Sequence, residues 1–242
     1  MKQRLDQAIA ERNLTASRSQ AESYIKLGLV KVNGKVIDQP AYMVLTNDKI
    51  SIEVENQYVS RAGLKLESIA DKLGLDFESK NVLDVGSSTG GFTDYALKHG
   101  ARKVIAVELG VGQLHPKLIG DKRIELHEKT DIRDINKLST PVDLALIDVS
   151  FVSLREIIPA VLKLINPNTQ IIPMFKPQFE TSSEFRHKGV IKNDKIRRKL
   201  LADFEAWLQS NELVVIKKAD SEVLGAKGNT ERFYLIKKAQ KP

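Results

Sequence analysis

The 242-residue chain contains no cysteine. This absence excludes disulfides, thiolate zinc sites and iron–sulfur clusters, and it excludes every mechanism in which a cysteine attacks the substrate. The four histidines (His99, His115, His127 and His187) show no spacing typical of metal ligands, so no metal site is expected. No stretch approaches the roughly 18 to 20 consecutive apolar residues that span a bilayer, so no membrane segment is predicted.

The chain also lacks the apolar core of a signal peptide, because charged residues follow Met1 directly. We therefore expect a cytoplasmic protein. Lysine and arginine number 38 against 31 acidic residues, which favours a polyanionic partner. Basic residues are concentrated in two runs. Residues 1–35 contain seven basic and three acidic residues, and residues 186–199 contain seven basic residues and one acidic residue. Taken alone, either run is best explained as a solvated helix face.

The first quarter of the chain is predicted to form two helices followed by a hairpin. Apolar residues recur at helical spacing over 4–12 and again over 21–27. An alternation of apolar and polar residues surrounds Asn33-Gly34, a strong signal for a tight hairpin. A further strand, Lys49–Val54, completes a small α+β domain that we assign to residues 1–58.

These residues resemble the small RNA-binding domain named after ribosomal protein S-four. The resemblance rests on Arg4-Leu5-Asp6, Ser17-Arg18-Ser19-Gln20-Ala21, Ile25, Gly28 and Val30-Lys31-Val32-Asn33-Gly34. In that family the two helices present basic and polar side chains to structured RNA, which implies phosphate contacts that give affinity and orientation. The residues expected to bind RNA are Arg4, Arg18, Lys26 and Lys31. The alternative is a small packing module with solvated charges.

After a junction at 59–80, which includes an amphipathic helix at Gly63–Leu73, strands and helices alternate. This pattern predicts a Rossmann-like α/β domain, residues 59–242, with a mainly parallel, doubly wound sheet. The expected strands are Val82–Val85, Lys103–Glu108, Ile124–His127, Leu144–Asp148, Gln170–Phe175, Leu213–Lys217 and Phe233–Ile236. The expected helices lie near Gly91–His99, Leu154–Leu164 and Asp194–Ser210.

A glycine-rich turn follows the first of these strands. Glycines allow the backbone to approach a ligand, but their spacing, Gly-x-x-x-Gly-Gly, differs from that of dinucleotide folds and disfavours NAD. Glu108 at the next strand end can accept hydrogen bonds from both hydroxyls of a ribose, and Asp131 could receive an adenine amino group. The ordered set resembles the S-adenosylmethionine pocket of doubly wound methyltransferases. The residues expected to bind this cofactor are Asp84, Gly86, Ser87, Ser88, Thr89, Gly90, Gly91, Phe92, Thr93, Glu108, Asp131 and Asp148.

The residues at the later strand ends narrow the reaction. Asp148-Val149-Ser150-Phe151 lacks the Pro-Pro pair typical of exocyclic-amine methyltransferases, and a chain without cysteine cannot use the usual route to cytosine C5. Lys65, Asp148, Lys176 and Glu231 occur in the order of the FtsJ-type RNA 2′-O-methyltransferases. Nearly the full length, front domain included, resembles the TlyA family on Arg61–Leu66, Asp84–Thr93, Phe175–Phe179 and Lys227–Glu231. Asp131 departs from the asparagine expected there.

The resemblance implies methyl transfer to a ribose 2′-hydroxyl of ribosomal RNA or a ribosomal subunit, with a cytidine of the large-subunit RNA as target and the small-subunit RNA as a second possibility. A ribose hydroxyl is a poor nucleophile, so its proton must be removed during attack. We infer that Lys176 is the base, that Asp148 orients it, that Lys65 positions the hydroxyl and that Glu231 fixes Lys65 or the substrate. The alternatives are a non-catalytic RNA-binding or ribosome-assembly factor and a membrane-active haemolysin, a label common in this family.

Overall fold

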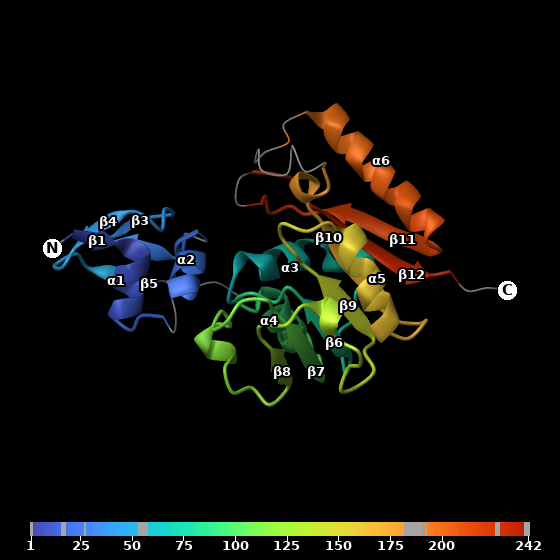
Figure 1. Cartoon of the computed structure of the whole chain (residues 1–242), viewed down its shortest axis with the longest axis horizontal. Helices are drawn as coiled ribbons and strands as arrows, with labels where there is room; N and C mark the ends of the chain where they lie inside the picture. The colour runs from blue at the N-terminus through green and yellow to red at the C-terminus, as the bar shows by residue number, and fades with distance from the viewer. Residues whose placement is uncertain are drawn as a thin grey trace.

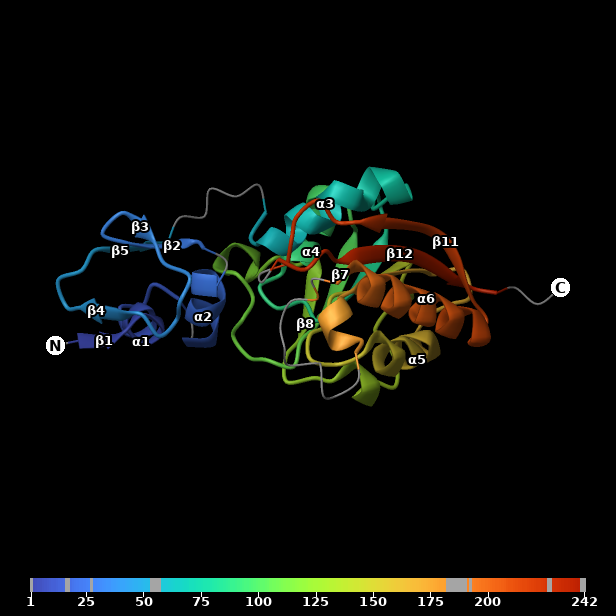
Figure 2. The same cartoon turned by 90° about the horizontal axis from the view of Figure 1, so that it is seen from above.

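The protein, seen here as a computed structural model, consists of two units joined end to end (Figure 1). The structure describes residues 2–15, 18–26, 28–52, 58–181, 191, 193–225 and 228–239, without the side chains of Ser19, Gln20, Ser23 and Lys26. Figure 2 shows from a second direction that the small N-terminal unit lies beside one end of the larger unit. The two units have separate hydrophobic cores.

The N-terminal unit packs two helices on short strands. Its elements are β1 (Lys2–Arg4), α1 (Leu5–Glu11), α2 (Arg18–Lys26), β2 (Val30–Val32), β3 (Lys35–Val36), β4 (Met43–Leu45) and β5 (Ile50–Ile52). Strand β2 pairs with β3 and with β5 in antiparallel fashion. Asn33 and Gly34 both have positive φ, 50° and 83°, as a tight hairpin between twisted strands requires. The hairpin prediction is confirmed.

Sequence analysis missed the pairing of β1 with β4 in this unit. Arg4, which we placed at the start of the first helix, is the last residue of β1, and α1 begins at Leu5. Both strands are three residues long, and in β4 only Val44 is buried. Such short strands leave too little alternation to be recognised from sequence.

The C-terminal unit is a seven-stranded sheet between two layers of helices. Its elements are α3 (Arg61–Leu73), β6 (Asn81–Val85), α4 (Gly91–Lys98), β7 (Lys103–Val107), η1 (Pro116–Leu118), β8 (Ile124–His127), η2 (Ile132–Asp134), β9 (Leu144–Ile147), α5 (Leu154–Leu164), β10 (Gln170–Phe175), η3 (Pro177–Phe179), α6 (Asp194–Ser210), β11 (Leu213–Asp220) and β12 (Arg232–Lys238). The strand order is β11-β12-β10-β9-β6-β7-β8, and β12 alone runs antiparallel to both of its neighbours.

Successive strand residues point to opposite faces of this sheet and enter two different cores. Val82 and Val104 pack with α3 and α4, whereas Leu83 and Ile105 pack with α5 and α6. Figure 2 shows these helix pairs on opposite faces of the sheet. The doubly wound α/β class, with a small α+β domain in front, is therefore confirmed.

Helix α3 begins two residues earlier than expected, because Ser60 caps it by accepting a hydrogen bond from the Ala62 amide at 3.3 Å. The helix then packs closely on the start of α4. A Cβ added at Gly91 would clash with Ser60 Oγ and lie 2.7 Å from the Ala62 Cβ. Glycine at this position thus sets the approach of α3, the helix that carries Lys65.

In the part of the chain that the structure describes, no helix combines the length and apolar character needed to cross a membrane.

We expect Gly91→Ala to lower the free energy of unfolding by about 1–3 kcal/mol, because the added methyl overpacks the α3–α4 contact. Gly120→Ala is the control: a Cβ there meets nothing within 4 Å, so only its φ of 85° adds strain. Urea denaturation of both variants measures the difference. A loss at Gly91 no larger than that at Gly120 would contradict the packing argument.

Candidate active site

Three neighbouring strands meet at the edge of the sheet where the parallel strands end. Asp148 follows β9 and Lys176 follows β10, and these strands are parallel neighbours. On the other side of β10, Phe175 pairs with Arg232 of antiparallel β12. Continued by one residue, this register places Glu231 opposite Lys176. The topology therefore brings residues that are 55 positions apart in the printed sequence to one edge of the sheet.

Two lysine–carboxylate pairs occupy this edge. Lys176 Nζ lies 2.6 Å from Asp148 Oδ1, and it also donates to Ser150 Oγ at 2.9 Å. Lys65 Nζ, on the second turn of α3, lies 2.6 Å from Glu231 Oε2. The side chain of Lys176 is 11% exposed and that of Glu231 is 4% exposed. All four residues predicted to be catalytic are thus brought together in two well-shielded ion pairs.

Burial makes each of these pairs interdependent. Removing one partner would leave a partly desolvated charge without its counterion, a situation that costs several kcal/mol in buried pairs. Because each lysine has its own carboxylate, two cations can stand at the same edge without strong mutual repulsion. Such an edge can hold a hydroxyl group between proton donors and acceptors.

A cavity of about 650 Å³ lies beside the Lys176–Asp148 pair. Its lining includes Gly86, Ser88, Glu108, Leu109, Gly110, Gln113, Thr130, Asp131, Ile132, Arg133, Asp148, Val149, Ser150 and Phe151. The volume lies within the range of sites for cofactors and drug-sized ligands, roughly 300–1,000 Å³. Asp148 belongs to both the cavity and the ion pair, so a ligand in the cavity would adjoin the lysine.

Glu108 is the first residue after β7, and backbone amides hold its carboxylate in place. Its two oxygens accept hydrogen bonds from the Ser88 amide at 2.9 Å and the Gly110 amide at 2.7 Å. A carboxylate fixed in this way and lining the cavity suits the paired hydroxyls of a ribose. Gly86, with φ of 82°, lets the glycine turn approach the other side, because a Cβ there would lie 2.5 Å from the Asp148 carbonyl oxygen. These donors and acceptors fit an adenosyl cofactor.

Comparison with known proteins agrees with this geometry. The FtsJ-like methyltransferase family matches residues 58–238, and the S4 domain matches residues 3–50. A 23S rRNA (cytidine-2′-O)-methyltransferase TlyA from Campylobacter jejuni is 38% identical over 79% of this chain and 76% of that relative. A 16S/23S rRNA (cytidine-2′-O)-methyltransferase TlyA from Mycobacterium tuberculosis is 30% identical over 97% and 89% of the two chains. The chain belongs to the TlyA family.

Other similar proteins carry the name hemolysin. Hemolysin A of Brachyspira hyodysenteriae is 37% identical over 94% of this chain and 97% of its own length. A solved Streptococcus thermophilus structure with a hemolysin name superposes with a TM-score of 0.76 at 33% identity and covers all of this chain and 90% of that one. As an FtsJ-like member of the TlyA family, the protein is a methyltransferase, and S-adenosylmethionine is its cofactor.

The residues predicted to bind the cofactor fall into two groups. Five line the cavity: Gly86, Ser88, Glu108, Asp131 and Asp148. The others do not belong to the lining of this cavity: Asp84, Ser87, Thr89, Gly90, Gly91, Phe92 and Thr93. Phe92 instead packs in the core, with its ring 5.9 Å from that of Phe233. Thr93 donates to Asp84 at 2.6 Å beneath the glycine turn, so these residues support the turn from behind.

Asp131 differs from Glu108 in its surroundings. The Arg133 guanidinium, two residues away, binds both of its carboxylate oxygens at 2.9 and 2.6 Å. Arg133 thereby holds the pKa of Asp131 below its usual value. Asp131 also caps the turn η2 by accepting from the Arg133 amide. The adenine contact that we assigned to Asp131 stays a prediction, and any such contact must coexist with this ion pair.

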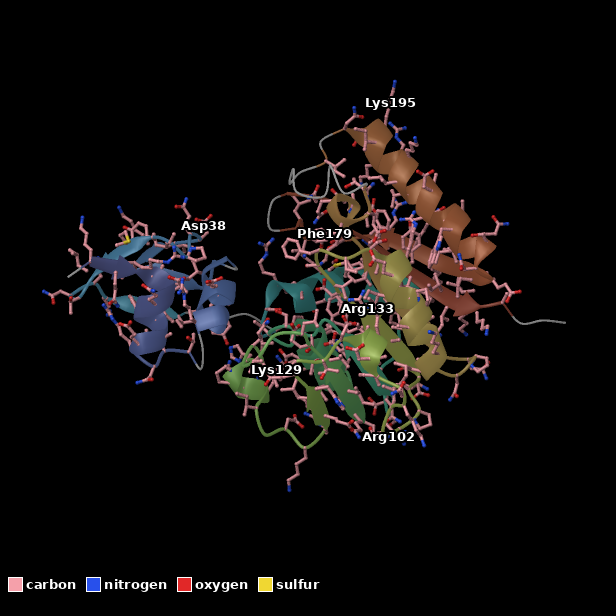
Figure 3. The ribbon with its side chains drawn as sticks, in the orientation of Figure 1. Asp38, Arg102, Lys129, Arg133, Phe179 and Lys195 are labelled. Carbon is pink, nitrogen blue, oxygen red and sulfur yellow. The ribbon has the colours of Figure 1, made fainter. Side chains whose placement is uncertain are left out.

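Sequence analysis did not assign a role to Phe151, which stands at the mouth of the cavity. Its side chain is 76% exposed and its φ is 65°, a conformation that is strained for an aromatic residue. Its ring lies 5.0 Å from that of Phe179. Phe179 belongs to η3, the turn after β10 (Figure 3). Lys176 Nζ in turn lies 5.8 Å from the Phe179 ring. An aromatic residue three positions after a strand-end aspartate was the available signal.

The residues assigned to RNA binding are placed as follows. Arg4 and Arg18 both bind the fully buried carboxylate of Asp6, at 3.0 and 2.9 Å, and part of each arginine side chain stays exposed. Lys31 lies on β2 in the three-stranded sheet. The side chain of Lys26 lies outside the described residues, as do Arg186, Lys188 and Lys192 of the second basic run and Lys227. These RNA contacts stay predictions.

Burial raises the pKa of Asp84 to about 7, against the hydrogen bond from Thr93. Between the unfolded value near 3.8 and this folded value, the folded protein holds a proton that the unfolded chain has released. Stability should therefore fall as pH rises from 4 to 7, by at most about 1.4 kcal/mol per pH unit.

We expect Asp84→Asn to flatten this dependence, because the amide accepts from Thr93 but does not titrate. Urea unfolding of the cofactor-free protein between pH 4 and 8 measures it. Asp203→Asn, at an exposed position of α6, is the control and should keep the wild-type slope. Parallel wild-type and Asp84→Asn curves would show that Asp84 ionises normally.

Proposed function

We propose that the protein transfers a methyl group from S-adenosylmethionine to a ribose 2′-hydroxyl of ribosomal RNA, with a cytidine as the target nucleotide. The observation that carries this proposal is the Lys176–Asp148 pair at 2.6 Å on the rim of the cofactor cavity. TlyA relatives that share most of the chain are named for this reaction on 23S and on 16S/23S rRNA. Ribosomal RNA as substrate agrees with the expected cytoplasmic location.

When bound, S-adenosylmethionine supplies an electrophilic methyl group on a sulfonium. Glu108 would hold its ribose hydroxyls, and Gly86 and Ser88 would face its remaining polar groups. The chain must then align a weak nucleophile and accept its proton. Alignment of bound groups alone contributes much of the acceleration in such transfers.

Lys176 is the base in this proposal. Once Lys176 has released its own proton to solvent, the free amine accepts the hydroxyl proton while Asp148 and Ser150 fix the position of Nζ. Asp148 then stabilises the ammonium that forms. Lys65, held in place by Glu231, donates a hydrogen bond to the ribose oxygen. The two pairs thus divide proton acceptance from orientation of the hydroxyl.

The Phe151–Phe179 pair, in which Phe151 is largely exposed and Phe179 is partly buried, is suited to the base of the target nucleotide. RNA bases that are extruded from a helix stack on aromatic side chains. A base stacked on these rings would hold its own ribose next to Lys176, because the Phe179 ring lies near both Phe151 and the Lys176 amine. The arginines on Asp6 would bind phosphates at the other end of the molecule, which supplies affinity and orientation.

We expect Lys176→Ala to abolish methyl transfer while the affinity for S-adenosylmethionine changes little, because Lys176 does not line the cofactor cavity. The assay uses labelled S-adenosylmethionine, purified ribosomal subunits, nuclease digestion and mass spectrometry. Lys163→Ala, an exposed lysine of α5, is the control and should keep wild-type turnover.

A labelled ribose in the wild-type digest supports the proposal. A labelled base contradicts the lysine mechanism, as does normal turnover of Lys176→Ala. The alternative of a non-catalytic RNA-binding factor predicts no transfer to any RNA by the wild-type protein.

We expect Arg18→Ala to raise the KM for ribosomal subunits about tenfold at unchanged kcat, and to reduce the slope of log affinity against log salt by about 1. Arg18→Lys keeps the charge and should lose less. Arg4 still pairs with Asp6 in both variants. Steady-state kinetics at several salt concentrations measures these effects. An unchanged KM for Arg18→Ala would remove Arg18 from the RNA contact.

A further inference from the structure

Glu180 has a buried carboxylate close to the proposed base, and the functional roles above do not include it. It stands four residues after Lys176, at the end of η3, and its side chain is 2% exposed. Three donors converge on it: Ser153 Oγ at 2.6 Å, the Leu154 amide at 2.7 Å and Arg155 Nη1 at 2.8 Å. Donors to a charged, buried acceptor form strong hydrogen bonds.

The donors all belong to the first turn of α5, the helix that follows the Asp148 loop. Ser153 is the N-cap of this helix and also accepts from the Arg155 amide at 3.1 Å. The helix N-terminus itself favours a negative charge. Glu180 therefore ties the turn that carries Lys176 to the loop that carries Asp148, through contacts 25 to 27 residues apart in sequence.

This tie lies beyond the end of the sheet register. The last parallel pair between β9 and β10 is Ile147 with Pro173, so Asp148 and Lys176 both extend past the ladder. Two contacts join the loops between the Ile147–Pro173 pair and Glu180. One is the 2.6 Å contact of Lys176 with Asp148, and the other is the packing of Phe151 on Phe179. The two catalytic loops are thus held at one end by the sheet and at the other by Glu180.

We propose that Glu180 is a positioning residue for methyl transfer, acting through the Lys176–Asp148 contact and the Phe151–Phe179 platform. This inference rests on the proposed function of Lys176. Glu180 does not line the cofactor cavity, so it acts on the alignment of the reacting groups rather than on cofactor binding. Displacement of a reacting group by about 1 Å lowers rates by up to about a hundredfold.

The test is Glu180→Gln, which keeps the shape of the side chain but replaces one of its two acceptor oxygens by an NH₂ group. In either orientation of the amide, that group cannot accept the hydrogen bond from Ser153 or the one from the Leu154 amide. We expect kcat on ribosomal subunits to fall about tenfold or more, while the KM for RNA and the Kd for S-adenosylmethionine stay within about threefold. Glu180→Asp retains the charge and should recover part of kcat. Ser153→Ala removes one arm of the contact and should show an intermediate loss.

Glu78→Gln is the matched control, because this exposed glutamate precedes β6, at the edge of the sheet opposite the site, and its loss should leave kcat unchanged. Thermal unfolding of every variant is measured, and kinetics are run well below its midpoint so that the folded fraction is constant. A Glu180→Gln enzyme with normal kcat overturns the proposal. So does a loss shared equally by kcat, KM and cofactor affinity, which would show general unfolding. If the wild type itself labels no ribose, the proposed function fails first and independently.

Discussion

The 2.6 Å contact between Lys176 and Asp148 is the interaction on which the site depends, and it exists because two parallel strands end side by side. Neither residue could be shielded from water alone, since a lone desolvated charge is far more costly than a matched pair. Each lysine at this edge therefore has its own carboxylate: Lys176 pairs with Asp148, and Lys65 pairs with Glu231 on the other side of β10. The edge then holds two cations and two anions, and it remains open toward the cofactor cavity through Asp148.

Much of this arrangement could be predicted from sequence because it follows from strand ends. Apolar strands such as Val82–Val85 and Leu144–Asp148 enter both cores and leave a continuous apolar signal, so their boundaries were found within one or two residues. Once the order of parallel strands is known, residues just after them must gather at one edge. Lys176 and Asp148 were found in this way, with the family motif as the guide, whereas Glu231, which precedes the antiparallel strand β12, was found from the motif alone.

Other features depend on tertiary contacts that no local pattern encodes. The hydrogen bonds of Glu180 come from donors at the start of α5, and nothing in its neighbourhood of the sequence points to them. The difference between Glu108 and Asp131 is similar. Both follow a strand, but Glu108 is held by backbone amides of two turns, whereas Asp131 is taken up by a nearby arginine. A rule based on strand ends treats the two carboxylates alike. They differ in one tertiary contact, from the Ser88 amide to Glu108, and in one local contact, from Arg133 two residues after Asp131.

The N-terminal unit also pairs a shielded carboxylate with basic side chains, here Asp6 with Arg4 and Arg18. Asp6 is fully buried, and although burial opposes its ionisation, the hydrogen bonds from Arg4 and Arg18 outweigh that effect and hold its pKa below the usual value. The aspartate therefore remains an anion and keeps two flexible guanidiniums close together, which reduces the conformational entropy they would lose on meeting phosphate. In both units a shielded carboxylate thus orients cations: Asp6 orients the two arginines that we propose bind a polyanion, and Asp148 orients the lysine that we propose accepts a proton. Because the cores are separate, binding strength and chemistry can vary independently along one chain.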